Sequence, residues 1–126
     1  MTIDDVPFAQ LLGIKVDSME PGHAVLSLEM RDDLMRNRGI AHGGVAATLI
    51  DSAMAMAIQP MLGANESTTT VDLTIHYLRP LREGTARASA RVVRAGKRVI
   101  TVSAELFDHN EKLAATAIST YLRLSV

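Results

Sequence analysis

The chain has 126 residues, 48% hydrophobic and 21% charged, a balance typical of one globular domain rather than of a disordered or collagen-like chain. Its net charge of −1 argues against general binding to nucleic acid or to an anionic membrane, because such binding needs a basic excess. Cysteine is absent, which excludes disulfides, thiolate metal sites and a cysteine nucleophile. We therefore treat residues 1–126 as a single domain.

The N-terminal residues lack the basic region and apolar run of a signal peptide. The most apolar stretch, 45–58, is shorter than the roughly 20 residues that span a bilayer. We expect a cytoplasmic protein with no membrane or nucleic-acid partner.

The first third of the chain predicts a short helix and a hairpin. Pro7 suits the first turn of a helix over 7–14, and Gly13 suits its end. Residues 15–30 predict a β-hairpin that turns at Pro21–Gly22. Residues 31–38 are charged and read as a connector.

Residues 43–59 predict one long helix, rich in Ala, Leu and Met and followed by Pro60. The helix is apolar nearly all round, so we expect it to be buried on most sides.

The second half predicts strands at 68–78, 85–93, 98–107 and 113–124, because apolar and polar residues alternate along them. The predicted fold class is α+β, with one long central helix wrapped by a curved antiparallel sheet of five to six strands. Residues expected to face the helix are often alanine, which allows close approach: Ala86, Ala88, Ala90 and Ala104.

Asp51 is the one acid within the apolar helix. A desolvated carboxylate can serve as a base or a nucleophile. Alternatively, Asp51 lies on a solvated edge, or Ser52 or a strand residue satisfies it by hydrogen bonding.

The segment Gly39-Ile40-Ala41-His42-Gly43-Gly44 opens the same helix. Unpaired amides at a helix start favour negative charge, so those of Gly43 and Gly44 could bind a phosphate or polarise a carbonyl. Alternatively, the glycines only form a tight turn and His42 only caps the helix.

The spacing of these groups suggests a site shared between subunits. His42 and Asp51 are separated by about 13.5 Å along a helix and by about half a turn. If both act on one small group, they come from different protomers of a twofold dimer.

Basic residues border several predicted strand ends. Collectively they could bind a phosphorylated ligand, although each could equally belong to a solvated rim. They are Arg79, Arg82, Arg94, Lys97 and Arg98. The four histidines show no i,i+4 pair, and no metal site is expected.

Three strings together resemble one family: 37–44 (Asn-Arg-Gly-Ile-Ala-His-Gly-Gly), 49–51 (Leu-Ile-Asp) and 70–80, which ends in Tyr-Leu-Arg-Pro. The chain resembles the hot-dog-fold acyl-CoA thioesterases of the PaaI-like group, relatives of phenylacetate-pathway and 4-hydroxybenzoyl-CoA thioesterases, over almost its whole length. The resemblance implies a helix wrapped by a sheet, homodimers joined edge to edge that commonly pair into tetramers, and no cofactor.

The resemblance also implies residue roles. Asp51 matches the catalytic acid, either a nucleophile or a base for water, and Gly43 matches the amide that polarises the thioester carbonyl. His42 matches the histidine that orients the loop or the thioester, and Thr70 matches a hydroxyl near the acid. The family often has asparagine where this chain has Arg36, and Asn37 follows one step later.

The implied reaction is hydrolysis of an acyl-CoA or aryl-CoA to free acid and CoA at the dimer interface. Pantetheine would run through a channel there, with Gly44 and Asn37 beside it, and Met54 would line the acyl pocket. Two alternatives are a non-catalytic acyl-CoA-binding module and, with less support, a hydroxyacyl-thioester dehydratase, which would need a histidine near the acid.

Overall fold

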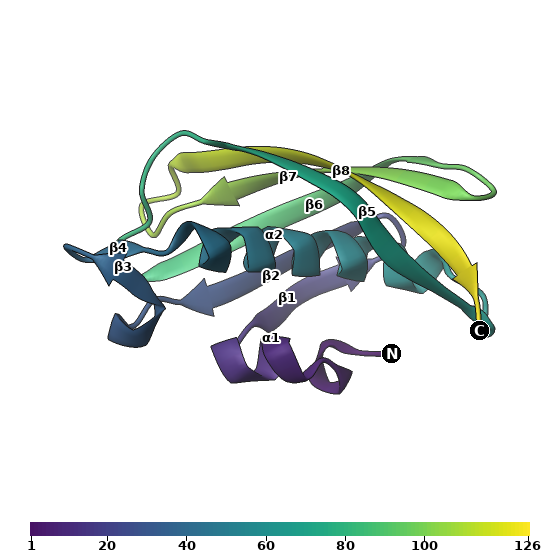
Figure 1. Ribbon diagram of the computed structural model, residues 1–126, viewed down its shortest axis with the longest axis horizontal. Coiled ribbons are helices and arrows are strands. Elements are labelled where there is room, and N and C mark those ends of the chain that lie inside the picture. Colours follow the sequence, from purple (N-terminus) through teal and green to yellow (C-terminus); the bar gives the residue numbers. More distant parts are fainter.

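A six-stranded antiparallel sheet wraps one long helix in the computed structural model, which describes residues 1–126 (Figure 1). The helix is α2 (Gly43–Ile58). The strands are β1 (Lys15–Glu20), β2 (His23–Glu29), β5 (Glu66–Tyr77), β6 (Thr85–Ala95), β7 (Val99–Phe107) and β8 (Leu113–Ser125). Their order in the sheet is β1-β2-β6-β7-β8-β5, so β1 and β5 form the two edges. The predicted fold class is confirmed.

The elements of the first third are shorter than predicted, and the connector is more ordered. Helix α1 (Pro7–Leu12) begins at proline and ends at Gly13, which has a left-handed φ of 84°. The charged connector is not irregular. It contains a 3₁₀ turn (Asp32–Leu34) and a small separate hairpin of β3 (Met35–Asn37) and β4 (Ile40–Ala41), which leads directly into α2.

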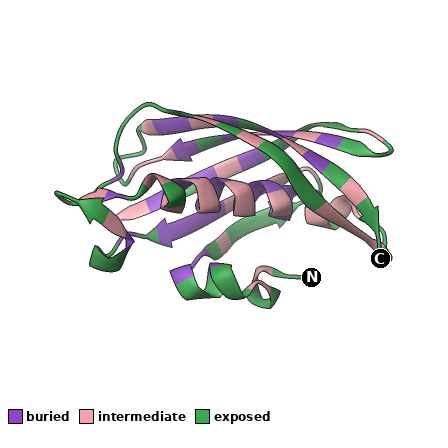
Figure 2. Ribbon diagram, in the orientation of Figure 1, coloured by how far each residue is buried: buried purple, intermediate pink, exposed green.

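The core lies between α2 and the concave face of the sheet, where α2 packs mainly on β2, β6 and β7. The alanines predicted to face the helix are all buried there, which lets the helix and sheet approach closely. Figure 2 shows buried residues along β2 and the central strands, whereas α1 and the edge strand β5 are largely exposed or intermediate.

Burial of α2 is less complete than predicted. Half of its residues are buried, and a strip along one side is not covered by the sheet. Gly44, Thr48, Asp51 and Ala55 recur along this strip at helical spacing and are half-buried or exposed. The uncovered strip therefore carries the one acid of the helix. No helix of the structure is both long and apolar enough to pass through a lipid bilayer.

Candidate active site

The start of α2 presents a free backbone amide. His42 caps the helix as predicted, because its Nδ1 accepts a hydrogen bond of 2.9 Å from the Gly44 N–H. The ring lies so close that a Cβ on Gly44 would be 3.0 Å from Nδ1, so a larger residue here would push the His42 ring aside by a few tenths of an ångström. The N–H of Gly43 has no acceptor within its helix, and no cap or loop hydrogen bond uses it.

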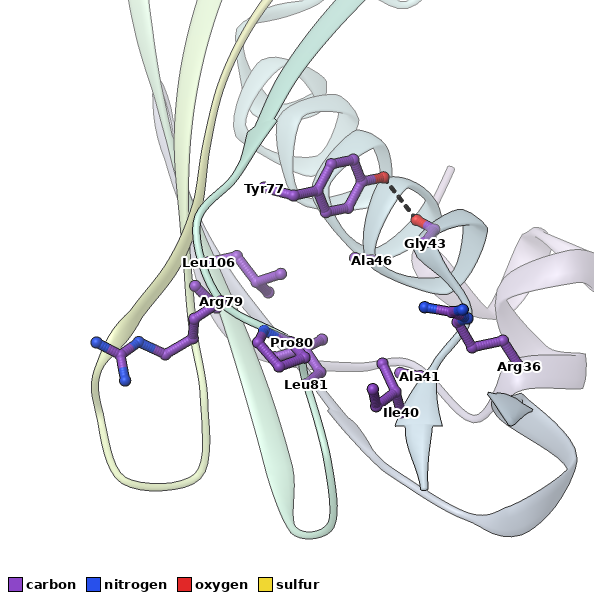
Figure 3. Close-up of a pocket in the computed structure, with 11 residues that line it drawn as sticks. Arg36, Ile40, Ala41, Gly43, Ala46, Tyr77, Arg79, Pro80, Leu81 and Leu106 are labelled. Atoms are coloured by element: carbon purple, nitrogen blue, oxygen red, sulfur yellow. Dashed lines mark hydrogen bonds between the residues drawn. The ribbon is translucent and has the colours of Figure 1, made fainter. Parts of the chain in front are cut away.

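Tyr77, at the end of β5, ties this helix start to the sheet edge. Its hydroxyl donates a hydrogen bond of 2.7 Å to the Gly43 carbonyl oxygen (Figure 3). The sequence assigns Tyr77 no site role, because a tyrosine in an alternating strand is equally typical of a core residue.

A mostly apolar pocket of about 260 Å³ opens at this helix start, lined by Arg36, Ile40, Ala41, Gly43, Ala46, Tyr77, Arg79, Pro80, Leu81, Leu106 and Ala114. Figure 3 shows the Arg36 side chain reaching toward the beginning of α2, whereas that of Arg79 extends away from Gly43. Neither guanidinium forms an ion pair. Asn37 is exposed and does not line the pocket, so Arg36 is the β3 residue that faces it.

The Asp51 carboxylate is half-buried, on the uncovered strip of α2. Its Oδ1 accepts a hydrogen bond of 3.0 Å from the Thr70 hydroxyl and another from the Tyr121 hydroxyl. Its Oδ2 has no hydrogen-bond partner within the chain. Strand hydroxyls thus satisfy Oδ1 of Asp51 by hydrogen bonding, while Oδ2 accepts no hydrogen bond from the chain. Hydrogen bonding by a strand residue was one of the alternatives that the sequence left open.

Tyr121, whose hydroxyl reaches Asp51, is only 2% exposed. Nothing in the sequence pattern predicted it as a site residue. Its hydroxyl also lies 3.0 Å from the Asp51 carbonyl oxygen. Burial first, and then the negative charge of Asp51, raise the pKa of the Tyr121 phenol well above its usual value. The phenol therefore stays protonated and remains a donor.

A β-bulge at Val71 lets the side chains of Thr70 and Tyr77 on β5 both face α2. Thr70 pairs with Tyr121 across the β5–β8 ladder, and Asp72 pairs with Thr120, which leaves Val71 unpaired and 59% exposed. In a regular strand Thr70 and Tyr77 would point to opposite faces, because seven residues separate them. With the extra residue, Thr70 reaches Asp51 while Tyr77 reaches Gly43.

A second pocket, of about 290 Å³, adjoins Asp51 and is separate from the one at Gly43. Its other lining residues are uncharged: Val6, Phe8, Ala9, Ala47, Thr48, Ser52 and Leu73. Met54 does not line it and is fully buried in the core. Gly43 and Asp51 of one chain are separated by about 12 Å along the helix, so a single chain does not bring them together.

The basic residues predicted to bind phosphate are exposed and lie at two ends of the sheet. Arg79 follows β5, beside the β7–β8 turn, since its N–H bonds to the Ala114 carbonyl. Arg94, Lys97 and Arg98 lie at the β6–β7 turn, at the opposite end of these strands. They do not form one cluster within a chain. No three His, Asp or Glu side chains come together as metal ligands.

Residues 38–115 match the model of the thioesterase superfamily. The chain belongs to this superfamily. It is 28% identical over 137 aligned positions to the medium/long-chain acyl-CoA thioesterase YigI of Salmonella typhimurium, with 97% of this chain and 88% of YigI covered. The family membership inferred from the His-Gly-Gly and Leu-Ile-Asp motifs is confirmed.

Solved structures of PaaI proteins have the same hot-dog fold. The phenylacetic acid degradation protein PaaI of Thermus thermophilus, solved as a variant, superposes with a TM-score of 0.85 at 34% identity, covering 94% of this chain and 99% of that one. PaaI of Escherichia coli superposes with a TM-score of 0.90 at 27% identity, covering 97% and 87%. The chain is therefore a PaaI-like thioester hydrolase.

Proposed function

We propose that this protein hydrolyses an acyl-CoA or aryl-CoA to the free acid and CoA at a site shared by two subunits. One observation carries the proposal. A half-buried carboxylate has one oxygen held by two strand hydroxyls and one oxygen free, while the same helix begins with an unpaired amide. An acid that activates water, or attacks itself, and an amide that stabilises an oxyanion are the two components that thioester hydrolysis needs.

A second copy is needed because Asp51 and Gly43 of one chain are too far apart. The edge strand β5 provides the surface for it. Its outer edge is unpaired over 12 residues and carries Val71, whereas the other edge, β1, is half as long and half of its residues are charged. Long unprotected edges pair readily with another strand. We therefore propose that β5 pairs with β5 of the partner subunit.

The contacts along β5 specify the register of this pairing. Thr70 is hydrogen-bonded to Asp51, and Tyr77 is hydrogen-bonded to Gly43. To bring Asp51 to the Gly43 amide of the partner subunit, Thr70 must lie opposite Tyr77 of the partner subunit. Counting the Val71 bulge as one extra residue, the twofold axis then passes at Thr74.

The midpoints along the helix and the strand support one common axis. Ala47 is midway between Gly43 and Asp51 on α2, and Leu73 adjoins Thr74 on β5. Both line the pocket beside Asp51. An axis through this pocket would join it to the Gly43 pocket of the partner subunit. It would also place Arg79 of one subunit and the β6–β7 turn of the partner subunit at the same end of the joined sheet, where CoA phosphates could bind.

In the proposed reaction the thioester carbonyl oxygen accepts a hydrogen bond from the Gly43 N–H, and Asp51 Oδ2 of the other subunit faces the carbonyl carbon. Either Oδ2 removes a proton from water as the water oxygen attacks, or Oδ2 attacks and forms a mixed anhydride that water then hydrolyses. In both routes the C–S bond breaks and the CoA thiolate takes up a proton. The uncharged pocket beside Asp51 suits an acyl or aryl group without charge. A cytoplasmic location remains part of the proposal.

The decisive experiment measures free thiol released from a panel of acyl-CoA and aryl-CoA substrates. Asp51→Ala and Asp51→Asn should lower kcat/KM by roughly 10³-fold or more while the fold is retained. Asp33→Asn, which changes an exposed aspartate elsewhere, should retain wild-type turnover. Turnover in H₂¹⁸O under single-turnover conditions distinguishes the base route from an anhydride that water hydrolyses at the Asp51 carboxyl carbon, because only that hydrolysis labels Asp51. Enoyl product would favour the dehydratase, and tight binding without turnover would favour the binding module. Light scattering on the same sample reports whether dimers pair into tetramers.

A further inference from the structure

The Tyr121 hydroxyl is a buried polar group that holds the proposed catalytic acid, and the proposed reaction gives it no separate task. We propose that Tyr121 is a positioning residue. Its hydroxyl fixes Oδ1 of Asp51 and so leaves Oδ2 as the oxygen that acts on the substrate. This inference rests on the proposed function of Asp51, and it assigns different tasks to the two oxygens of the same carboxylate.

The hydrogen bonds around Asp51 are one-sided. Oδ1 accepts from Thr70 on β5 and from Tyr121 on β8, and these two residues are direct partners in the β5–β8 ladder. The phenol has one proton, and the carboxylate oxygen is a stronger acceptor than the nearby Asp51 carbonyl. Oδ2 receives no hydrogen bond from the chain, so its lone pairs remain available.

Tyr121 is suited to this task because its hydroxyl stays protonated and its ring is enclosed by the core. The side chain is 2% exposed, packed in the core between the sheet and α2. Burial and the charge of Asp51 raise its pKa, so the phenol stays protonated throughout the working pH range. Because the hydroxyl is enclosed, it does not reach the substrate.

No other titratable side chain faces Asp51. The pocket beside the carboxylate is lined by Val6, Phe8 and Ala9 from the α1 segment, by Ala47, Thr48 and Ser52 from α2 and by Leu73 from β5, all of which are uncharged. Strands β5 and β8 add Thr70 and Tyr121. Within the chain, the side chains that contact the Asp51 carboxylate are therefore hydroxyl donors and uncharged pocket residues, and none is a cation.

Removing the phenol hydroxyl should therefore affect the charge state of the acid as well as its geometry. A hydrogen bond donated to a carboxylate favours its ionised form over its protonated form. Without this bond the acid protonates at higher pH, and the carboxylate is free to rotate about its χ2 angle. Loss of a hydrogen bond to a charged group changes an equilibrium roughly tenfold to a hundredfold, which corresponds to about one to two pH units.

The experiment compares pH–rate profiles of wild type and Tyr121→Phe on the best substrate of the panel. We expect the midpoint of the acid limb of kcat to rise by about one pH unit, the plateau kcat to fall roughly tenfold or more and KM to change little. Carboxyl ¹³C NMR follows the Asp51 titration directly, with its signal assigned by its loss in Asp51→Asn, and should show the same upward shift. This readout does not depend on turnover.

Ser119→Ala is the matched control. Ser119 is buried on the same strand, two residues from Tyr121, but its hydroxyl donates to a backbone carbonyl, that of Asp72, and not to the acid. Because Ser119→Ala removes a buried hydroxyl that does not contact Asp51, it should lower the melting temperature but leave the midpoint of the acid limb of the pH–rate profile unchanged. If Tyr121→Phe does not fold, 3-fluorotyrosine at position 121 replaces it. This analogue retains the hydroxyl but is a stronger donor, so it should move the limb to lower pH.

The outcomes separate this inference from the proposed function. An inactive wild type, or an active Asp51→Asn, overturns the thioesterase proposal, while the NMR titration still tests Tyr121. An active wild type and an inactive Asp51→Asn, together with an unshifted titration of Asp51 in Tyr121→Phe, overturn the role of Tyr121 and leave the thioesterase proposal standing.

Discussion

Adding a single methyl group at Gly43 should lower catalytic activity without lowering the stability of the fold. A Cβ there would lie 3.5 Å from the Tyr77 hydroxyl, an ordinary contact, and the backbone does not have a positive φ. Gly43→Ala should therefore fold with a melting temperature equal to or slightly above that of wild type. Because the methyl group would occupy the pocket beside the amide, we expect kcat/KM to fall by roughly 10². Gly63→Ala, distant from the pocket, should keep normal activity. Full activity of Gly43→Ala would mean that the carbonyl does not approach this amide.

The individual site residues differ in how readily the sequence predicts them. The His-Gly-Gly motif and the isolated acid in an apolar helix identified His42, Gly43 and Asp51, because these signals are local. Tyr121 was missed, since its importance depends on the residue that lies across the sheet, and no local pattern encodes that register. Met54 was expected in the acyl pocket, but its side of α2 faces the core, and helix periodicity alone does not reveal which side a sheet covers.

At the scale of elements, an ion pair joins β5 to β8 where the sheet ends. Arg123 Nη1 lies 3.2 Å from Glu66 Oε1, and the same carboxylate accepts the Gly63 N–H at 2.9 Å. The Gly63 hydrogen bond and the Arg123 charge lower the pKa of Glu66, although desolvation opposes them. Since the pKa is lower in the folded state, the stabilisation exists above the unfolded value of 4.5 and disappears as the pH falls through the folded value.

Glu66→Gln should therefore melt below wild type near pH 7, and the difference should shrink as the pH falls below about 4.5. Thermal unfolding followed by circular dichroism between pH 3 and 7 measures this trend. Glu105→Gln is the control, because that side chain is exposed and belongs to none of the ion pairs of the structure, so it should show no such trend. A difference that is independent of pH would show that the charge of Glu66 contributes nothing.

The sequence predicted the elements themselves well, and it failed where an irregularity shifts the pattern. Helix α2 and the six main strands lie within a few residues of their predicted positions, because alternation and Pro/Gly breaks are strong local signals. The alternation in β5 predicted Val71 on the same face as Leu73, but the bulge leaves Val71 exposed. The hairpin of β3 and β4 was also missed, since two- and three-residue strands have no period to detect.

At the scale of the whole molecule, the proposed dimer can be tested with a single cysteine, because the chain has none of its own. If the twofold axis passes at Thr74, the two copies of this residue face each other across paired β5 strands, and Thr74→Cys should form a covalent dimer on mild oxidation. Ser18→Cys, equally exposed on the β1 edge, should not. Non-reducing electrophoresis distinguishes the two. Cross-linking through Ser18→Cys alone would assign the interface to the opposite edge.

The alanines beneath α2 constrain how this protein can diversify. Ala86, Ala88 and Ala90 are buried against a single rigid helix that carries both Gly43 and Asp51. Enlarging any of them would displace the helix at a cost of about 1–3 kcal/mol and would move both groups of the proposed site at once. The α1 segment instead contributes Val6 and Phe8 to the wall beside Asp51, and these two side chains are half-buried or exposed. Under the proposed function, substitutions at Val6 and Phe8 should therefore change the acyl preference while Gly43 and Asp51 stay in place.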